Sequence, residues 1–300
     1  MTARTLPSSL IICSRNRPRL LLETVESVLD GEDLPAEIVV VDQGDEEHAE
    51  LARLGKTDGC DVRYLWRPSR GLSRARNEGA AAARHEILVY CDDDMRATPS
   101  WFGTVVRALE QEGRGTAVTG QVIAGTPEAK NGFTPALAAG NTRIVYEGRI
   151  DTDVLAGCNM AMYRSALDEV GGFDERLGAG ARYPSADDND LGFRLLEAGY
   201  RILYVPEATL QHRAWRAGSE YPLVRWRYGQ GKGGFYAKHL SASDRHMLRR
   251  VRRDIGHRLV RFPRVVWRRP RLAAGDVLYS LGILAGGLTW LISERRRHPR

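Results

Sequence analysis

Apolar positions in the first 125 residues follow two spacings, one typical of buried strands and the other of helices. Short β-branched runs predict strands at residues 10–13, 38–41, 62–66, 87–91 and 117–123. The segments between these runs have helical spacing or composition, and they predict helices at 18–29, 46–54, 73–84 and 99–112. Short strands separated by helices predict an α/β fold with a mostly parallel sheet that helices cover on both faces.

The pattern loosens between residues 125 and 153, where we expect loops or a weak hairpin. It then becomes regular again and predicts strands at 157–163 and 201–205, helices at 165–170 and 188–198, and a glycine-rich stretch at 171–182. No internal repeat or low-complexity linker is found in the sequence before about residue 241. We therefore expect residues 1–240 to form one domain and residues 241–300 to form a separate helical tail.

Two helical patterns follow in this tail. In the first, apolar residues recur every three or four positions with Arg on the other faces, at Leu248, Val251, Ile255, Leu259, Phe262 and Val266. This spacing predicts a basic amphipathic helix that bends or breaks near Pro263. The second is an uncharged run over 277–293, slightly shorter than the roughly 20 residues that span a bilayer. The spacing of Gly282 and Gly286 would permit close pairing with another helix.

The charge of the chain is unevenly distributed. The tail contains 15 Arg, no Lys and 4 acidic residues, a net charge of +11, whereas residues 1–240 carry a net charge of −5. So basic a segment favours a polyanion, either anionic lipid or nucleic acid. Because Arg supplies nearly every polar position, and Trp267 and Trp290 suit an interfacial depth, we expect residues 245–297 to contact an anionic membrane surface. Spanning and surface-lying arrangements both remain open, and no nucleic acid is expected because no recognised nucleic-acid module appears.

The remaining bulk features are those of an ordinary globular protein, with 43% hydrophobic and 27% charged residues. The four cysteines lie far apart without CxxC spacing, which favours buried, reduced thiols. The N-terminal residues lack the long apolar stretch of a secretory signal. We therefore expect the body of the protein in the cytoplasm.

Acidic clusters occur where the predicted parallel sheet would bind a ligand, beyond the carboxyl ends of its strands. The sequence has Asp42-Gln43 after the second strand, Asp92-Asp93-Asp94 after the strand 87–91, and four polar residues at 187–190 where a helix begins. Three adjacent carboxylates repel one another, and a hard cation such as Mg²⁺ or Mn²⁺ relieves that repulsion and could hold a diphosphate. The alternatives are a solvated acidic turn at 92–94 and a helix N-cap at 187–190.

Six segments between Ser8 and His212 together resemble glycosyltransferase family 2, the inverting enzymes of the GT-A fold. They are the strand and turn at 10–17, the strand ending in Asp42-Gln43, the run Gly71-Leu-Ser-Arg-Ala-Arg76-Asn77-Glu-Gly79, the DxD strand at 87–95, the acceptor-side residues 157–160 with 171–175, and the helix start Asp187-Asp188-Asn-Asp190-Leu191 with Arg194-Leu195. Each segment alone is a weak signal, but six in this order are strong.

The resemblance implies roles for particular residues. Asp94 would bind Mn²⁺ or Mg²⁺, and His212 would complete the metal site, as a His after the last strand does in some relatives. Asp188 would be the catalytic base that deprotonates the acceptor for inverting displacement. The nucleotide-sugar donor would be bound by Arg15, Asp42, Gln43, Arg76, Asp92 and Asp93.

The chain departs from the family pattern at two positions. Gln43 stands where the family often has Asp, and its amide both donates and accepts hydrogen bonds, so the nucleotide base is open. Asp187 stands where the family usually has Glu, and its side chain is shorter by one methylene group. The basic, glycine-rich run at 229–234 lacks P-loop spacing, and we expect it to be a mobile loop that closes over the donor.

The resemblance predicts an inverting glycosyltransferase at the cytoplasmic face of the membrane, and the tail suggests a lipid-linked or cell-surface polysaccharide acceptor. One alternative is a nucleotidyltransferase, which would normally have a glycine-rich phosphate loop after the first strand, whereas residues 14–18 contain no Gly. The other is a non-catalytic basic protein that binds membrane or nucleic acid, which leaves the acidic clusters at 92–94 and 187–190 unexplained.

Overall fold

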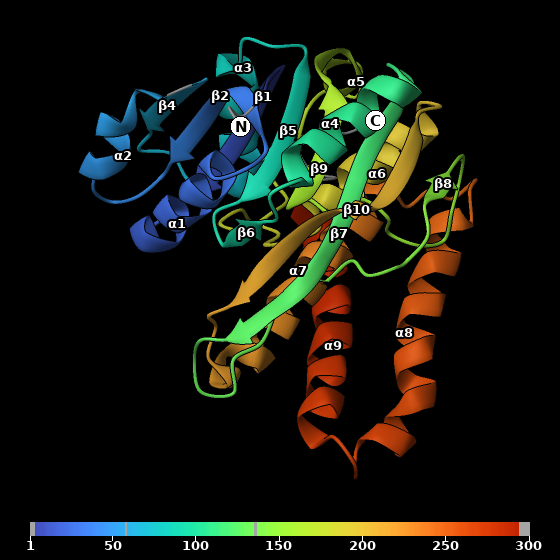
Figure 1. Cartoon of the computed structure of the whole chain (residues 1–300). Helices are drawn as coiled ribbons and strands as arrows, with labels where there is room; N and C mark the ends of the chain where they lie inside the picture. Colours follow the sequence, from blue (N-terminus) through green and yellow to red (C-terminus); the bar gives the residue numbers. More distant parts are fainter. Residues whose placement is uncertain (1–3, 58, 135–136, 294–300) are drawn as a thin grey trace.

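The computed structural model describes residues 4–57, 59–134 and 137–293 (Figure 1). Its strands are β1 (Arg4–Ser14), β2 (Asp33–Asp42), β3 (Lys56–Thr57), β4 (Cys60–Trp66), β5 (Ile87–Asp92), β6 (Met95–Ala97), β7 (Thr116–Pro127), β8 (Ile144–Tyr146), β9 (Asn159–Tyr163) and β10 (Arg201–Ala214). Its helices are α1 (Pro18–Leu29), α2 (Ala49–Leu54), α3 (Leu72–Ala82), α4 (Trp101–Glu112), α5 (Arg164–Glu169), α6 (Asp187–Glu197), the 3₁₀ turn η1 (Gly218–Glu220), α7 (Tyr221–His239), α8 (His246–Val265) and α9 (Pro270–Ser293).

The strands form one sheet with the order β3-β4-β2-β1-β5-β9-β7-β10-β6, and β8 also pairs with β10. The predicted α/β fold is confirmed, and strands β4, β2, β1 and β5 are parallel as expected. The other half of the sheet is mixed, because β9 runs antiparallel to both β5 and β7. Residues 128–158, which include β8, connect β7 to β9.

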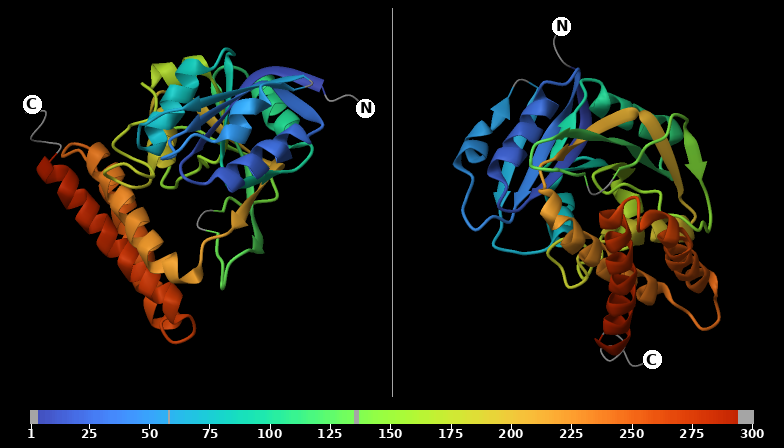
Figure 2. Two further views of the ribbon diagram at one scale, coloured as in Figure 1. Left: turned by 90° about the vertical axis from the view of Figure 1, so that its left-hand side faces the viewer. Right: turned by 90° about the horizontal axis from the view of Figure 1, so that it is seen from below.

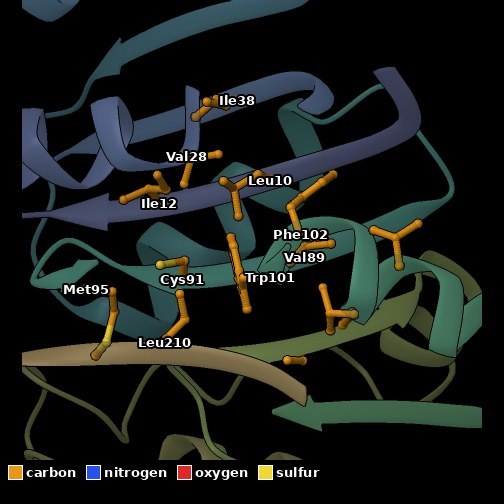
Figure 3. Close-up of a cluster of buried hydrophobic side chains, with 14 of the residues drawn as sticks. Leu10, Ile12, Val28, Ile38, Val89, Cys91, Met95, Trp101, Phe102 and Leu210 are labelled. Carbon is orange, nitrogen blue, oxygen red and sulfur yellow. The ribbon is translucent and has the colours of Figure 1, made fainter. Parts of the chain in front are cut away.

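The core has two layers, one on each face of the sheet. Because side chains alternate along a strand, Leu10 and Ile12 of β1 pack into the layer with α1 and α4 (Figure 3), and Ile11 and Cys13 pack into the layer with α3 and α6. Trp101 of α4 is fully buried in the first layer. All four cysteines are buried free thiols, as predicted. The double burial of β1 explains its continuous apolar run.

Strand register places two of the three predicted acidic clusters, those after β2 and β5, at one edge. Ser14 at the end of β1 lies opposite Asp42 at the end of β2, and Cys13 lies opposite Asp92 at the end of β5. β10 continues nine residues beyond the predicted end at 205, past an irregularity between Val205 and Thr209. The extension pairs His212 with Met95 of β6, and so brings the end of β10 to the same edge.

Three long helices, α7, α8 and α9, lie together at one side of the sheet, and α9 runs along α7 (Figure 2). The predicted mobile loop at 229–234 is wrong, because this run lies inside α7. Its glycines let the backbone of α9 approach: a Cβ on Gly229 or Gly233 would overlap a carbonyl oxygen of α9. The close pairing predicted for Gly282 and Gly286 is confirmed, since both meet the backbone of α7.

Candidate active site

The site lies at the carboxyl edge of β1, β2 and β5, with the first turn of α6 on one side and the end of β10 on the other. The sequence-predicted residues Arg76, Asp92, Asp93, Asp94 and His212 come together here through direct contacts. Arg15 lies further out, where its half-exposed guanidinium is 3.4 Å from Asp45. No contact of Arg15 with the acidic cluster is found among the described residues.

Arg76 of α3 is the buried link between β5 and α6. Its Nη2 donates to Asp92 Oδ1 at 2.8 Å and to the carbonyl oxygen of Gly157 at 2.9 Å, and its Nη1 donates to Asp187. Burial disfavours the guanidinium charge, but Asp187 and Asp92 outweigh it and raise the pKa of Arg76 further. These bonds engage the guanidinium and position two carboxylates. Asp187, which stands where the family usually has Glu, is buried against Arg76.

Asp93 is turned into the protein. Its side chain is fully buried and accepts a hydrogen bond from Ser14 Oγ at 2.5 Å, and it lies 3.1 Å from Arg17 Nη1. Burial raises the pKa of the Asp93 carboxyl to about 7. Its place against β1 suits a residue that supports the edge of the site.

Asp94 has a different surrounding. Its carboxylate is 3.0 Å from Arg17 Nη1 and 3.5 Å from His212 Nε2, and it accepts a hydrogen bond from Trp215 Nε1 at 2.9 Å. Although burial disfavours its charge, His212, Arg17 and Trp215 together hold the pKa of Asp94 well below its usual range. Asp94 therefore stays ionised, as a ligand of a hard cation must.

The residues present fit a metal ion that takes most of its ligands from water and from substrate phosphates. Over the described ranges, no group of three or more His, Cys, Asp or Glu side chains is arranged to hold a metal ion. Asp94 and His212 offer one carboxylate and one imidazole side by side. Mg²⁺ characteristically binds to one or two carboxylates and completes its shell with water and substrate phosphates, so a two-residue site suits such an ion when diphosphate is present.

Asp188 is the first-turn carboxylate of α6 that stays free of ion pairs among the described residues. Its Oδ2 accepts from the Gly157 amide at 3.2 Å, and its Oδ1 accepts from the Asn189 amide at 2.8 Å. Burial, with the neighbouring Asp187, raises the pKa of Asp188 to about 6. Asp188 also lines a small cavity between α6, Arg250 of α8 and the segment 148–155, with room for about one water molecule. An oriented carboxylate with this pKa beside a cavity can accept a proton near neutral pH.

The two residues at the end of β2 are engaged with neighbouring loops. Asp42 accepts hydrogen bonds from the Gly44 amide at 2.8 Å and from the Tyr64 hydroxyl at 2.7 Å. The Gln43 amide donates to Ser69 Oγ at 2.8 Å and accepts from the Gly71 amide at 3.0 Å. Gln43 thus connects β2 to the start of α3. An Asp side chain at this position would be one methylene group shorter.

Two residues of the site had no role assigned from the sequence. Arg17 is the N-cap residue just before α1 and reaches both Asp93 and Asp94, and Trp215 follows β10 and donates to Asp94. The Arg17 guanidinium also lies over the Trp215 ring, 5.5 Å from its centroid. The only sequence signal for either was its closeness to a predicted site residue, Arg15 or His212.

Several curated proteins are similar to this chain in sequence. The curated relatives include a glucosyl-dolichyl phosphate glucuronosyltransferase of Haloferax volcanii, 29% identical over an alignment of 228 positions that covers 73% of each chain. They also include a pre-mycofactocin glycosyltransferase of Mycobacterium tuberculosis, 28% identical over an alignment of 184 positions that covers 55% of this chain and 37% of that one.

Solved structures share the fold. A mannosyltransferase from Pyrobaculum calidifontis, in complex with GDP-Man and Mn²⁺, superposes with a TM-score of 0.63 at 16% identity, over 94% of this chain and 87% of that one. GalNAc-T7 with UDP, GalNAc and Mn²⁺ superposes with a TM-score of 0.54 at 21% identity, over 83% of this chain and 54% of that one. The fold is that of the GT-A glycosyltransferases.

The sequence model of glycosyl transferase family 2 matches residues 9–171, from β1 to the end of α5. That span is just over half of the chain and includes Asp42, Arg76 and the three aspartates 92–94. Asp188 and His212 lie beyond it, so the match does not extend to the two roles expected of them. This protein belongs to glycosyl transferase family 2.

Proposed function

We propose that the protein transfers a sugar from a nucleoside-diphosphate donor to an acceptor hydroxyl with inversion, and that Asp188 is the base. The observation that carries this proposal is the arrangement of two unlike carboxylates at one sheet edge. Asp94 is kept ionised by cationic and hydrogen-bonding neighbours, whereas the pKa of Asp188 is raised to about 6 by burial. A charge-binding group and a proton acceptor with separate environments suit a metal-assisted displacement.

The proposed donor site occupies the carboxyl edge of the sheet. Asp42 and Gln43 would face the nucleotide base, Asp92 the ribose, and Arg15 the rim of the site. Arg76 and Asp93 would act on the donor indirectly, because their polar atoms hold β5, α6 and β1 in place. The base and the sugar stay open, since Gln43 can both donate and accept.

We propose Mn²⁺ or Mg²⁺ as the cofactor, held by Asp94 and His212. Such an ion would supply positive charge to the departing diphosphate. The solved relatives from Pyrobaculum calidifontis and GalNAc-T7 each contain Mn²⁺, which supports a divalent ion in this fold. Arg17, which lies within 3.1 Å of both Asp93 and Asp94, adds a second positive charge at the same place.

The proposed chemistry is a single displacement. The Asp188 carboxylate takes the proton of the acceptor hydroxyl while the oxygen of that hydroxyl bonds to the anomeric carbon. The bond from that carbon to the diphosphate oxygen breaks, its electron pair leaves with the nucleoside diphosphate, and the configuration inverts. The amides of Gly157 and Asn189 fix the carboxylate for this transfer.

For the acceptor, we propose a lipid-linked or cell-surface glycan reached at the cytoplasmic face of the membrane. The Haloferax volcanii relative carries a dolichyl phosphate-linked sugar in its name, and the described tail contains an apolar helix, α9, that is long enough to cross a bilayer. The basic residues over 245–297 would face anionic lipid, and no nucleic acid is expected to bind.

A calorimetric panel of UDP, GDP, dTDP and CDP, with and without Mn²⁺, tests the donor site. One nucleotide should bind in a metal-dependent manner, and Asp94→Ala should weaken that binding by about tenfold or more. Asp168→Ala, at an exposed position of α5, is the matched control and should change nothing. Failure of all four nucleotides to bind the folded protein would favour the non-catalytic alternative.

A further inference from the structure

Helix α9 is apolar on two opposite faces. One face packs inside the protein, and its buried side chains include Tyr279, Ile283 and Trp290. The opposite face carries large apolar side chains three or four residues apart, each between 42% and 60% exposed: Val277, Leu281, Leu284, Leu288 and Ile292. We call these five residues the outer stripe. It covers about 22 Å of helix, a length of exposed apolar surface that marks an interaction site.

The inner face of α9 is closed by backbone contact. A Cβ on Gly282 would lie 2.9 Å from the Cα of Gly229, and a Cβ on Gly286 would overlap the carbonyl oxygen of Gln230. Packing this close leaves no room for lipid between α7 and α9. The two helices must therefore move as one body.

The ion pairs of α7 and α8 keep that body out of hydrocarbon. Lys232 of α7 is buried and donates to Asp153 at 2.5 Å, and Lys238 lies 2.7 Å from Asp190 of α6. Asp276 of α9 is itself buried, with Arg225 of α7 at 3.7 Å and a hydrogen bond from Arg261 of α8 at 2.8 Å. The length and composition of α9 alone permit it to span a bilayer. A spanning α9 would, however, have to separate from Arg225 and Arg261, which would leave Asp276 unpaired.

The charge around α9 fits an anionic partner. Eight arginines of α8, of the turn and of the start of α9 are exposed: Arg245, Arg249, Arg252, Arg253, Arg264, Arg268, Arg269 and Arg271. Trp267, at the turn between the two helices, is 89% exposed. Figure 1 shows this turn at the end of the α8–α9 hairpin farthest from the sheet. Arginines beside an exposed indole and an apolar stripe are typical of helices that bind the headgroup region of a bilayer.

We propose that α9 lies flat on an anionic bilayer and inserts the outer stripe at the acyl boundary without crossing the membrane. The exposed arginines then contact headgroup phosphates. This inference refines the proposed membrane location and rests on it only for the biological setting, because docking needs neither donor nor acceptor. It also decides between the two arrangements that the sequence left open, a spanning and a surface-lying helix.

Vesicle flotation tests the stripe. The full chain should float with phosphatidylcholine vesicles that contain about a third phosphatidylglycerol, and should float weakly with pure phosphatidylcholine. Changing Leu281, Leu284 and Leu288 together to Gln should weaken binding by about tenfold or more. The matched control is Ile144→Gln with Val145→Gln, two exposed apolar residues of β8, which should bind as the unaltered chain does. Equal binding by the triple variant would overturn the proposal.

Depth measurements test the orientation. The four described native cysteines are buried, so Val277→Cys, Leu284→Cys or Ile292→Cys can each be labelled selectively with an environment-sensitive fluorophore. A flat helix places the three labels at equal depth, as reported by lipid-borne quenchers. A spanning helix places Leu284→Cys deepest, which would contradict the proposal.

Two further measurements keep the outcomes separate. If the stripe instead binds a second copy of the chain, the unaltered protein will be a dimer without lipid and the triple variant a monomer, which also overturns the proposal. Nucleotide binding measured on the same samples distinguishes the two hypotheses. Intact nucleotide binding with no vesicle binding refutes the docking surface alone, and the reverse result refutes the donor site alone.

Discussion

Asp188 owes its proposed role to its surroundings. It shares the first turn of α6 with Asp187, which the Arg76 guanidinium neutralises, and its own carboxylate meets only amide donors among the described residues. The same residue type therefore serves as an ion-pair partner at one position and as a proton acceptor at the next. Sequence position alone does not distinguish the two.

A pH profile tests Asp188. A base acts in its ionised form, so kcat/KM should be constant above the pKa of about 6 and fall as the pH drops below it, by about tenfold per unit. Asp188→Asn should lower kcat by about 10²- to 10⁴-fold and leave nucleotide affinity nearly unchanged. Normal turnover by Asp188→Asn, or a profile without an acidic limb, would show that another group is the base.

Arg17 should compete with a divalent ion for the same carboxylates. Removal of its charge in Arg17→Met leaves Asp93 and Asp94 facing each other, and we expect a loss of about 3 kcal/mol in the free energy of unfolding, because two buried carboxylates lose their cation. Mn²⁺ should then raise the melting temperature of Arg17→Met more than that of the unaltered protein. Arg19→Met, at a side chain that is 75% exposed, is the control. If Mn²⁺ raised the melting temperature of Arg17→Met and of the unaltered protein equally, this interpretation would be contradicted.

At the scale of elements, the contact between α7 and α9 depends on glycine. Gly286→Ala should lower the free energy of unfolding by about 1–3 kcal/mol, because the new methyl group overlaps the carbonyl oxygen of Gln230. Gly256→Ala on α8 is the matched control, since its Cβ would meet open space and alanine favours a helix by about 1 kcal/mol. Chemical denaturation measures both. An unchanged stability in Gly286→Ala would mean that the two helices separate easily.

At the scale of the whole molecule, the tail is joined to the body. Arg250 of α8 donates to Asp153 at 2.7 Å, and α9 covers the glycine-lined face of α7. The domain boundary predicted at residue 240 falls in the connection between α7 and α8, and it remains a prediction.

Truncation after residue 240 tests that boundary. Because it exposes the apolar face of α7 and leaves the buried Lys232 with Asp153 but without Arg250, we expect the shortened chain to melt earlier and to aggregate. Size-exclusion chromatography and thermal unfolding compare the two chains. A monomeric 1–240 fragment with unchanged melting and nucleotide affinity would establish the tail as an independent unit.

Features that depend on residues close together in the chain could be predicted from the sequence. The predicted helix 18–29 has the bounds of α1, because Pro18 suits a first turn and its apolar residues repeat with the helical period. Asp92 was correctly placed at the end of a buried strand, and parallel pairing then brought it to the edge where β1 and β2 end. Family membership followed from the order of such local motifs.

Contacts between side chains that are far apart in the chain could not be predicted in this way. Trp215 donates to Asp94 across 121 positions of sequence, and no periodicity encodes such a contact. The glycines at 229–234 suggested a loop because glycine weakens an isolated helix, whereas packing against α9 stabilises α7 through backbone contacts that only glycine permits. Periodicity reports which face of an element is buried. The partner that buries it depends on how distant segments fold together, and that partner determines which carboxylate keeps its charge.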